Sequence, residues 1–347
     1  MSADTAAIAR NTLVASLVVL AVVALAALFI VAGRVLLLAF GGLLVAVMLD
    51  GLATWIADRT GMRRAWALGL VVLGIAALTA AAAALVGPQI AEQASLLGPA
   101  VGGGLASLLE RVAETSWGAP LLEEISGLAS QGVDAAGRVV GAFSTAVSGL
   151  VNVVVVIAIG IYLAASPETY RRGAVALVGE EARGRAWELL GRIGSALRSW
   201  LVGQLIAMLI VGGLTTAGLL LLDVPLALTL GLIAFLFAFV PYIGPIAAFV
   251  LAVLVALLES PELAARVVAL YLVIQFVESY LVTPLIHKQV VDLPPALLLF
   301  AQVLLGVLAG VLGVALSVPL TVVVIVAVQV LYVRDVLGTD DVEIMGN

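Results

Sequence analysis

The sequence contains little charge, no cysteine and a single histidine. Of its 347 residues only 11% are charged, whereas 64% are hydrophobic, and the mean hydropathy is +1.26. A soluble domain has about 25% charged residues and about 45–50% apolar ones. The ionisable side chains are too few to cover a surface that faces water. The composition therefore predicts an all-α, polytopic membrane protein.

The missing residue types exclude several kinds of site. Without cysteine the chain has no disulfide, no thiolate metal site and no cysteine nucleophile. The single histidine, His287, excludes a histidine cluster as a metal site and argues against a Ser-His-Asp triad. The chain has no G-x-x-x-x-G-K-[ST] loop for ATP, and its net charge of −6 argues against nucleic acid as a partner. We therefore expect no enzymatic activity, no cofactor and no metal.

Stretches without a charged residue locate the predicted membrane spans, because a helix that crosses a bilayer needs about 20 apolar residues. Six of these runs suit a single crossing each: Asn11–Gly33, Val35–Leu49, Ala65–Ala91, Gly149–Ala165, Ser199–Leu222 and Val267–Val282. The last of the six contains one charged residue, Glu278. Together with two longer runs, they predict about eight to ten membrane segments.

The two longer runs are Val224–Leu258 and Leu293–Val333, and each exceeds the length of one span. Each is interrupted near its middle by residues that break helices: Pro241, Tyr242, Gly244 and Pro245 in the first, and Gly306, Gly310 and Gly313 in the second. Divided there, the first run gives arms too short for a full crossing, which favours helical hairpins. Broken backbone at membrane depth is tolerated only where protein or a water-filled cavity satisfies it. The alternatives are a simple turn between short spans and, at Gly306–Gly310, GxxxG packing.

The basic residues predict the orientation in the membrane. If the N-terminus is cytoplasmic, only Arg34, Arg111, Arg138 and Arg266 of the 16 basic residues fall outside. The positive-inside rule then places both termini in the cytoplasm. Charges at the ends of spans, such as Asp50 and Asp223, are interpreted as markers of the interface.

This topology divides the chain into six parts. The extracytoplasmic insert 88–148 is expected to consist of short amphipathic helices, broken at Gly87-Pro88 and Gly98-Pro99, that lie against the membrane or a neighbouring subunit or form a small cap. The cytoplasmic segment 166–199 is arginine-rich and helical, and it is expected to rest on anionic headgroups. The others are N-terminal transmembrane helices (1–87), a transmembrane helix (149–165), a transport core (200–333, with hairpins 224–258 and 293–333) and an acidic cytoplasmic tail (334–347).

The C-terminal half contains a short internal match. At one constant offset, Asp223-Val224-Pro225 aligns with Asp292-Leu293-Pro294, and Gly244 falls on Gly313. The topology places Asp223 outside and Asp292 inside, so the two copies would have opposite orientations. Inverted repeats place a substrate site near the midplane between discontinuous helices, and rocking exposes it to alternate sides. Chance similarity between runs of Leu, Val and Ala is the alternative.

Four polar side chains within the predicted spans are candidates for transport or coupling: Glu278, Gln275, Gln302 and Gln204. A carboxylate at the membrane centre costs at least about 2.5 kcal/mol and is functional by default. Glu278 is therefore the leading candidate for binding a proton or Na⁺, with Gln275 on the same helical face. A structural ion pair with Lys288 or an arginine is the alternative. Gln302 and Gln204 either contact substrate or hold helices together.

Four motifs taken together resemble the AI-2E family of transporters, which are autoinducer-2 exporter-like proteins: Trp200-Leu201-Val202-Gly203-Gln204, Pro241-Tyr242-Ile243-Gly244-Pro245, Gln275…Glu278…Pro284 and Gly310…Gly313…Pro319-Leu320. The resemblance covers nearly the whole chain. It implies a multi-pass protein of a bacterial or archaeal inner membrane and a homo-oligomer, with a pentamer as one candidate.

The resemblance also implies export of a small polar metabolite or signal such as autoinducer-2, coupled to H⁺ or Na⁺. Two alternatives stay open at this point. One is a Na⁺(Li⁺)/H⁺ antiporter, and the other is a passive pore through a homo-oligomeric ring. The expected partners are thus the lipid bilayer, a small-molecule or ion substrate, and further copies of the chain.

Overall fold

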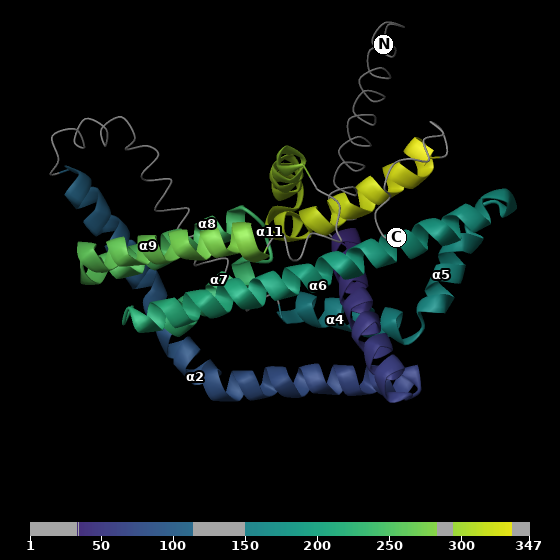
Figure 1. The fold of residues 1–347 in the computed structure, drawn as a ribbon, viewed down its shortest axis with the longest axis horizontal. Helices are drawn as coiled ribbons and strands as arrows, with labels where there is room; N and C mark the ends of the chain where they lie inside the picture. Colours follow the sequence, from purple (N-terminus) through teal and green to yellow (C-terminus); the bar gives the residue numbers. More distant parts are fainter. Residues whose placement is uncertain (1–32, 34, 114–149, 283–293, 335–347) are drawn as a thin grey trace, which may run out of the picture.

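The computed structural model describes residues 33, 35–113, 150–282 and 294–334, and in these ranges every regular element is a helix. A first helix covers Val35–Thr60. The elements that follow it are α2 (Arg64–Ala113), α4 (Leu150–Ala165), α5 (Pro167–Ala176), η1 (Glu180–Ala182), α6 (Arg183–Leu221), α7 (Ala227–Phe237), α8 (Ile243–Glu259), α9 (Pro261–Val277), η2 (Glu278–Val282), α11 (Pro295–Val328) and η3 (Gln329–Arg334) (Figure 1). The all-α prediction is confirmed.

Five described helices are long and apolar enough to cross a membrane: Val35–Thr60, Arg64–Ala84, Glu180–Leu221, Pro261–Tyr280 and Pro295–Arg334. A sixth is counted if α4 and α5, which meet at 87°, form one broken span. Helices α7 and α8 are apolar but shorter. The chain is thus a polytopic membrane protein. The predicted span Asn11–Gly33 lies, apart from Gly33, outside the described residues, so the number of eight to ten segments stays a prediction.

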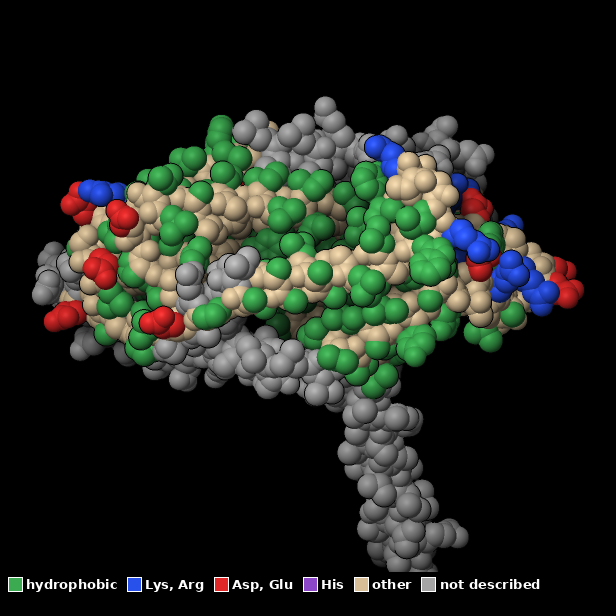
Figure 2. Space-filling view, turned by 90° about the horizontal axis from the view of Figure 1, so that it is seen from below, with side chains coloured by type: hydrophobic (Ala, Val, Ile, Leu, Met, Phe, Trp, Pro, Cys, Tyr) green, Lys and Arg blue, Asp and Glu red, His purple; other side chains and the backbone are tan. Residues whose placement is uncertain are grey.

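The surface has an apolar middle and charged ends. Charged side chains gather at the two ends of the long axis, and hydrophobic side chains cover much of the surface between them (Figure 2). Helices α6 and α9 run along this axis (Figure 1). Their large hydrophobic residues are widely exposed, with Leu209 at 58% and Leu272 at 67%. Because soluble monomers rarely expose apolar patches of this extent, this band is the surface expected to face lipid.

Helix α2 is one element that includes the two prolines predicted to interrupt it, but its axis bends sharply along its length (Figure 1). It runs from Arg64 to Ala113 with Pro88 and Pro99 inside. Its later part packs on the hairpin region, where Ala100 contacts the core and Gln93 Oε1 accepts hydrogen bonds from the Thr229 amide (3.2 Å) and hydroxyl (2.8 Å). Neighbouring helices make prolines tolerable at membrane depth, so packing on the hairpin region lets α2 bend without ending. Residues 114–148 of the predicted insert lie outside the described residues.

The arginine-rich segment 166–199 forms α5, η1 and the first part of α6. Helix α6 carries both the charged stretch from Arg183 to Arg198 and the apolar stretch that ends at Leu221, with no interruption between them. Glu188 on its charged part accepts hydrogen bonds from Arg192 (3.0 Å) and from Arg334 of η3 (2.6 Å). This network ties the charged part of α6 to the end of the last described helix.

The core has two main parts that meet on α6. One groups α6 through α9, with buried Leu219, Ile233 and Val267. The other packs α6 against α11 and the Val35–Thr60 helix, around Trp200 and Val322. The first part contains the helices of the first long apolar run, and the second part contains the helix of the second run. The interruptions in both runs therefore lie among packed helices.

Candidate functional site

The first predicted hairpin consists of α7 and α8, which pack against each other across a break at residues 238–242. Tyr242 has φ 66° and ψ −59°, and the Ile243 amide donates to the Pro241 carbonyl at 2.8 Å. This is the rare γ-turn with positive φ, which is strained. Strained backbone of this kind costs about 1–3 kcal/mol and gathers at functional sites. The turn therefore marks Tyr242 as part of a candidate site.

Gly244 and Pro245 begin α8. A Cβ at Gly244 would collide with the main-chain carbonyl of Phe237, the last residue of α7. Only glycine therefore permits the two helices to approach so closely. Pro245 lies in the first turn of α8, where proline is tolerated because the N–H has no helical partner. The Pro-Tyr-Ile-Gly-Pro motif thus forms the break and starts the next helix.

The second predicted hairpin is α11, in which two helical arms meet at a sharp kink at Gly310 (Figure 1). Gly310 has φ 64° and ψ −146°, a region that is essentially restricted to glycine. After the bend Gly313 is buried, and a Cβ there would collide with the Leu305 carbonyl. A Cβ at Gly306 would lie 2.8 Å from Val314 Cγ2. The three predicted glycines thus lie together at one bend.

The two breaks share one feature. A glycine after the bend, Gly244 or Gly313, lies against the carbonyl of a residue in the arm before it, Phe237 or Leu305. These are the two glycines that the internal match aligns. Similar local geometry at aligned positions supports a structural repeat in the C-terminal half. The opposite orientation of the two copies in the membrane stays a prediction.

Two of the four polar candidates meet at the first break. Gln204 of α6 donates from Nε2 to the Ala238 carbonyl at 2.6 Å, and Gln302 of α11 donates from Nε2 to the Pro241 carbonyl at 2.9 Å. Carbonyls just after a helix end lack N–H partners within the helix, so side-chain donors stabilise them. Two amides from different helices therefore hold the same turn.

Gln302 is fully buried, yet only one end of its amide is satisfied. Its exposed fraction is 0%, and its Oε1 has no hydrogen-bond partner. The Pro241 carbonyl fixes the orientation of the amide, since only the NH₂ group can face an acceptor. A buried polar atom without a partner costs about 1–3 kcal/mol. Gln302 Oε1 is therefore an acceptor available to a hydroxyl or ammonium group that enters the site.

Gln275 and Glu278 come together elsewhere, at the end of α9 and the start of the π-helical turn η2. Gln275 Nε2 donates to Ser279 Oγ at 3.3 Å and, through a long hydrogen bond of 3.5 Å, to Glu278 Oε2. The shared helical face that the spacing predicts is thus present. Single π-helical turns are frequent at functional sites. Lys288 of the alternative ion pair lies outside the described residues, as does Pro284 of the Gln275…Glu278…Pro284 motif.

The chemistry of these residues is that of a binding site. In the described ranges, no group of three or more His, Asp or Glu side chains could hold a metal ion. The break itself presents neutral amides and backbone carbonyls. Such groups orient a small polar ligand through hydrogen bonds, whereas hydrolytic chemistry needs a nucleophile and a base in mutual reach.

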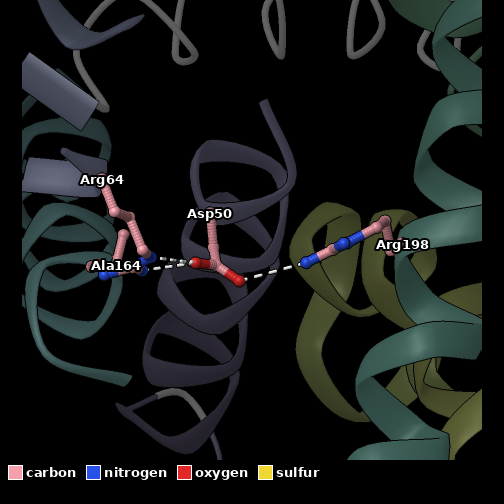
Figure 3. Close-up of polar contacts among 4 residues, drawn as sticks. All are labelled: Asp50, Arg64, Ala164 and Arg198. Atoms are coloured by element: carbon pink, nitrogen blue, oxygen red, sulfur yellow. Dashed lines mark hydrogen bonds and ion pairs between the residues drawn. The ribbon is translucent and has the colours of Figure 1, made fainter. Parts of the chain in front are cut away.

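A charged cluster that sequence reasoning missed joins four helices. Asp50 accepts from Arg64 of α2 through Oδ1 and from Arg198 of α6 through Oδ2, the latter at 3.1 Å (Figure 3). Arg64 also donates to the Ala164 carbonyl of α4 at 2.8 Å. From the sequence, Asp50 is interpreted only as a charge that marks the membrane interface. Its negative charge among the arginines of the predicted cytoplasmic side was the feature that could have pointed to ion pairs.

Comparison with known proteins identifies relatives. The model of a family described as AI-2E family transporter matches residues 17–333. Two Bacillus subtilis proteins that are named as transport proteins are similar to parts of the chain. YueF is 27% identical over 113 residues, which is 33% of this chain and 31% of YueF. YrrI is 28% identical over 168 residues, or 46% and 48% of the two chains. The chain thus spans about a third to a half of the length of these relatives.

Proposed function

The chain belongs to the AI-2E family of transporters, and from this premise we propose that it is a secondary transporter for a small polar metabolite or signal molecule. The proposed direction is export, and the proposed driving force is a gradient of H⁺ or Na⁺. The substrate class is the one that the family resemblance implies, a small polar molecule of the autoinducer-2 kind.

The observation that carries this proposal is the buried amide of Gln302. One end of the amide holds the Pro241 carbonyl at 2.9 Å, and the other end presents an acceptor without a partner. A substrate hydroxyl would satisfy Oε1 and remove the cost of an unpaired buried atom. The adjacent strained turn at Tyr242 and the second amide, Gln204, supply further polar groups.

The two breaks are the proposed moving parts. Discontinuous helices at membrane depth form the sites of many transporters, which work by rocking one part against the other. Gln302 lies on α11 but holds the turn of the first run, so movement of α11 would change the environment of Pro241. We propose that the two runs form an inverted repeat and expose the site to alternate sides.

Glu278 is the proposed coupling residue. Its carboxylate lies in an apolar helix and is accompanied by Gln275 at 3.5 Å. A carboxylate in an apolar helix can bind a proton or Na⁺, because either cation neutralises a charge that is energetically costly within the membrane. Gln275 is proposed to orient the carboxylate.

The proposed setting is the inner membrane of a bacterium or archaeon, with both termini in the cytoplasm. The distribution of arginines supports this orientation through the positive-inside rule, and the apolar band between charged ends supports a multi-pass arrangement (Figure 2). A homo-oligomer is proposed from the family, with a pentamer as one candidate.

A transport assay in proteoliposomes tests the proposal. The full chain is reconstituted and offered a panel of labelled polar metabolites, with the pH gradient and the Na⁺ gradient imposed separately. Gln302→Leu removes the amide at similar volume and is expected to lower transport about tenfold, as loss of one good hydrogen bond predicts. Val303→Ala, on the exposed face of the same helix, is the matched control. Wild-type transport by Gln302→Leu would refute the substrate role.

The coupling role is tested separately with Glu278→Gln. This variant is expected to insert normally, to lose concentrative transport and to become insensitive to the coupling gradient. An unchanged dependence on both gradients removes Glu278 from the mechanism. Flux through the wild-type protein that ignores both gradients would contradict a secondary transporter altogether.

A further inference from the structure

A cavity of about 810 Å³ lies away from the broken helices, beside the Asp50 cluster. Its walls come from the Val35–Thr60 helix, from the bend between α4 and α5, and from the charged part of α6. Arg64 at the start of α2 completes it. None of the four polar residues predicted to act in transport is among its lining residues. The cavity is therefore a second candidate site, separate from the proposed transport pathway.

The lining of this cavity carries an excess of positive charge. Its charged side chains are three guanidiniums and two carboxylates: Arg64, Arg171, Arg198, Asp50 and Glu168. Both oxygens of Asp50 are already bonded to Arg64 and Arg198. Glu168 is 60% exposed and bonds to Arg172 outside the cavity at 3.3 Å. Arg171 is thus the guanidinium of the cavity that forms no ion pair with either of the two lining carboxylates.

Arg171 is held in place but lacks an acceptor. Its guanidinium lies 4.3 Å from the centre of the Trp187 ring, which positions a cation over an aromatic face. A Cβ at Gly191 would lie 3.5 Å from Nη2, so α6 flanks the group on one side. Arg171 Nε is buried and has no hydrogen-bond partner. A positioned guanidinium with a free donor is suited to the planar recognition of a phosphate group.

One part of the wall carries hydroxyl side chains (Thr54, Ser166, Thr169, Tyr170 and Ser195), and another part is apolar and belongs to helices that enter the apolar part of the protein: Leu43, Ala46, Val47, Leu163, Ile193 and Leu197. A ligand that fills this cavity therefore needs one negative charge at one end and hydrocarbon at the other. A phosphodiester of a phospholipid has this combination, whereas a free phosphate supplies only the charge.

We propose that this cavity binds the phosphodiester headgroup of one anionic phospholipid, with Arg171 as the principal phosphate ligand and the acyl chains along the apolar wall. Arg64 and Arg198 contribute the surrounding positive field and remain bonded to Asp50. Basic pockets between membrane helices on the cytoplasmic side are suited to such headgroups. The 87° bend between α4 and α5 forms part of the cavity wall.

Native mass spectrometry of the full chain tests this site. Purified, delipidated protein in detergent is titrated with phosphatidylglycerol and, separately, with phosphatidylcholine of the same acyl chains. We expect the first phosphatidylglycerol to bind at least about fivefold more tightly. Arg171→Gln is expected to lose about that factor, because one arginine near an anionic headgroup contributes about this much. Arg183→Gln removes the same charge from α6 outside the cavity, where the arginine pairs with Glu180 at 3.4 Å, and is expected to bind as the wild type does.

A second variant fills the cavity without removing a charge. Gly194 lines the cavity, and a Cβ there meets nothing within 4 Å. Gly194→Leu is a favourable change for a helix and is expected to abolish the tight phosphatidylglycerol site. Gly184→Leu, on the same helix outside the cavity and also in open space, is its control. This pair keeps the test valid even if Arg171→Gln folds poorly.

Three results would overturn the proposal. One is equal binding of the two lipids by the wild type. Another is phosphatidylglycerol binding by Gly194→Leu that matches binding by Gly184→Leu. The third is competition by glycerol 3-phosphate at the concentration at which the lipid itself binds, which would assign the cavity to a soluble phosphate.

Discussion

The break between α7 and α8 and the bend in α11 occur at aligned glycines, but different residues permit them. In the first, the chain turns at a strained tyrosine, Tyr242, and amides from two other helices hold the carbonyls of the turn. In the second, the chain turns at Gly310, whose positive φ carries no side-chain penalty. The conformation of the first break therefore depends on hydrogen bonds from other helices, whereas the conformation of the second depends on having glycine at position 310.

This difference predicts that the first break, rather than the second, would respond to a bound substrate. A turn that other helices hold can change when those helices move or when a substrate competes for their amides. Gln302, which lies on α11, contributes one of these amides to the first break. The second run thus stabilises the turn of the first run through this hydrogen bond. Movement of α11 would therefore be transmitted to Pro241.

The largest expected effect comes from adding a methyl group at the shared glycines. Gly244→Ala and Gly313→Ala each drive a Cβ into a backbone carbonyl, and each is expected to lower the free energy of unfolding by about 3 kcal/mol. Thermal unfolding in detergent measures this. Gly213→Ala, in open space on α6, is the control. A large loss at only one of the two glycines would break the equivalence between the runs.

A smaller loss is expected for Gly310→Ala. A Cβ at this position meets nothing within 4 Å, so the cost comes from the backbone conformation alone and is about 2 kcal/mol. The same unfolding measurement applies. Stability equal to that of the wild type would show that the bend in α11 does not depend on glycine there.

The strain at the first break is tested by a pair of variants. Tyr242→Gly and Tyr242→Ala both remove the ring, so their difference isolates the backbone. The glycine variant is expected to be more stable by about 1 kcal/mol, because φ is positive at this position. An alanine variant at least as stable as the glycine variant would contradict the strained turn.

The smallest disturbance comes from single cysteines beside each break. The chain has no cysteine of its own, and Tyr242 and Val311 are 43% and 74% exposed. In Tyr242→Cys and Val311→Cys, a membrane-impermeant maleimide is expected to react from opposite sides, with rates that shift when substrate or the coupling ion is added. Reaction of both from one side under every condition would exclude an inverted repeat that alternates.

The helical fold and the positions of the breaks could be predicted from sequence because they depend on local properties. Proline ends a helix wherever it lacks support, so the break at Pro241 was predictable, and glycine permits positive φ, so the bend near Gly310 was too. The same local reasoning predicted that the helix ends at Pro88 and Pro99, where α2 instead stays one element, bent along its length and packed on the hairpin region (Figure 1). Contacts with neighbouring helices thus allow a proline to lie within a bent helix.

The partners of the polar residues could not be predicted in this way. Gln302 was a candidate because an amide within a span is unusual, but its acceptor, Pro241, is 61 residues away in the chain. Asp50 and Arg198 are separated by 148 residues. Such pairs follow from the packing of helices against one another, which a single sequence does not specify. The sign of the charge, an acid among the arginines of the predicted cytoplasmic side, was the local hint of the Asp50 cluster.

Helix α6 has a mechanical consequence. Its 39 residues form one uninterrupted rod, which at a rise of about 1.5 Å per residue is about 58 Å long and so nearly twice the hydrocarbon thickness of a bilayer. Gln204 lies on this rod along with the lining of the arginine cavity. A lipid bound at the charged part of α6, or tension in the membrane, would therefore tilt the whole helix and move Gln204, which bonds to the Ala238 carbonyl. The bilayer could in this way exert a force on the proposed transport site.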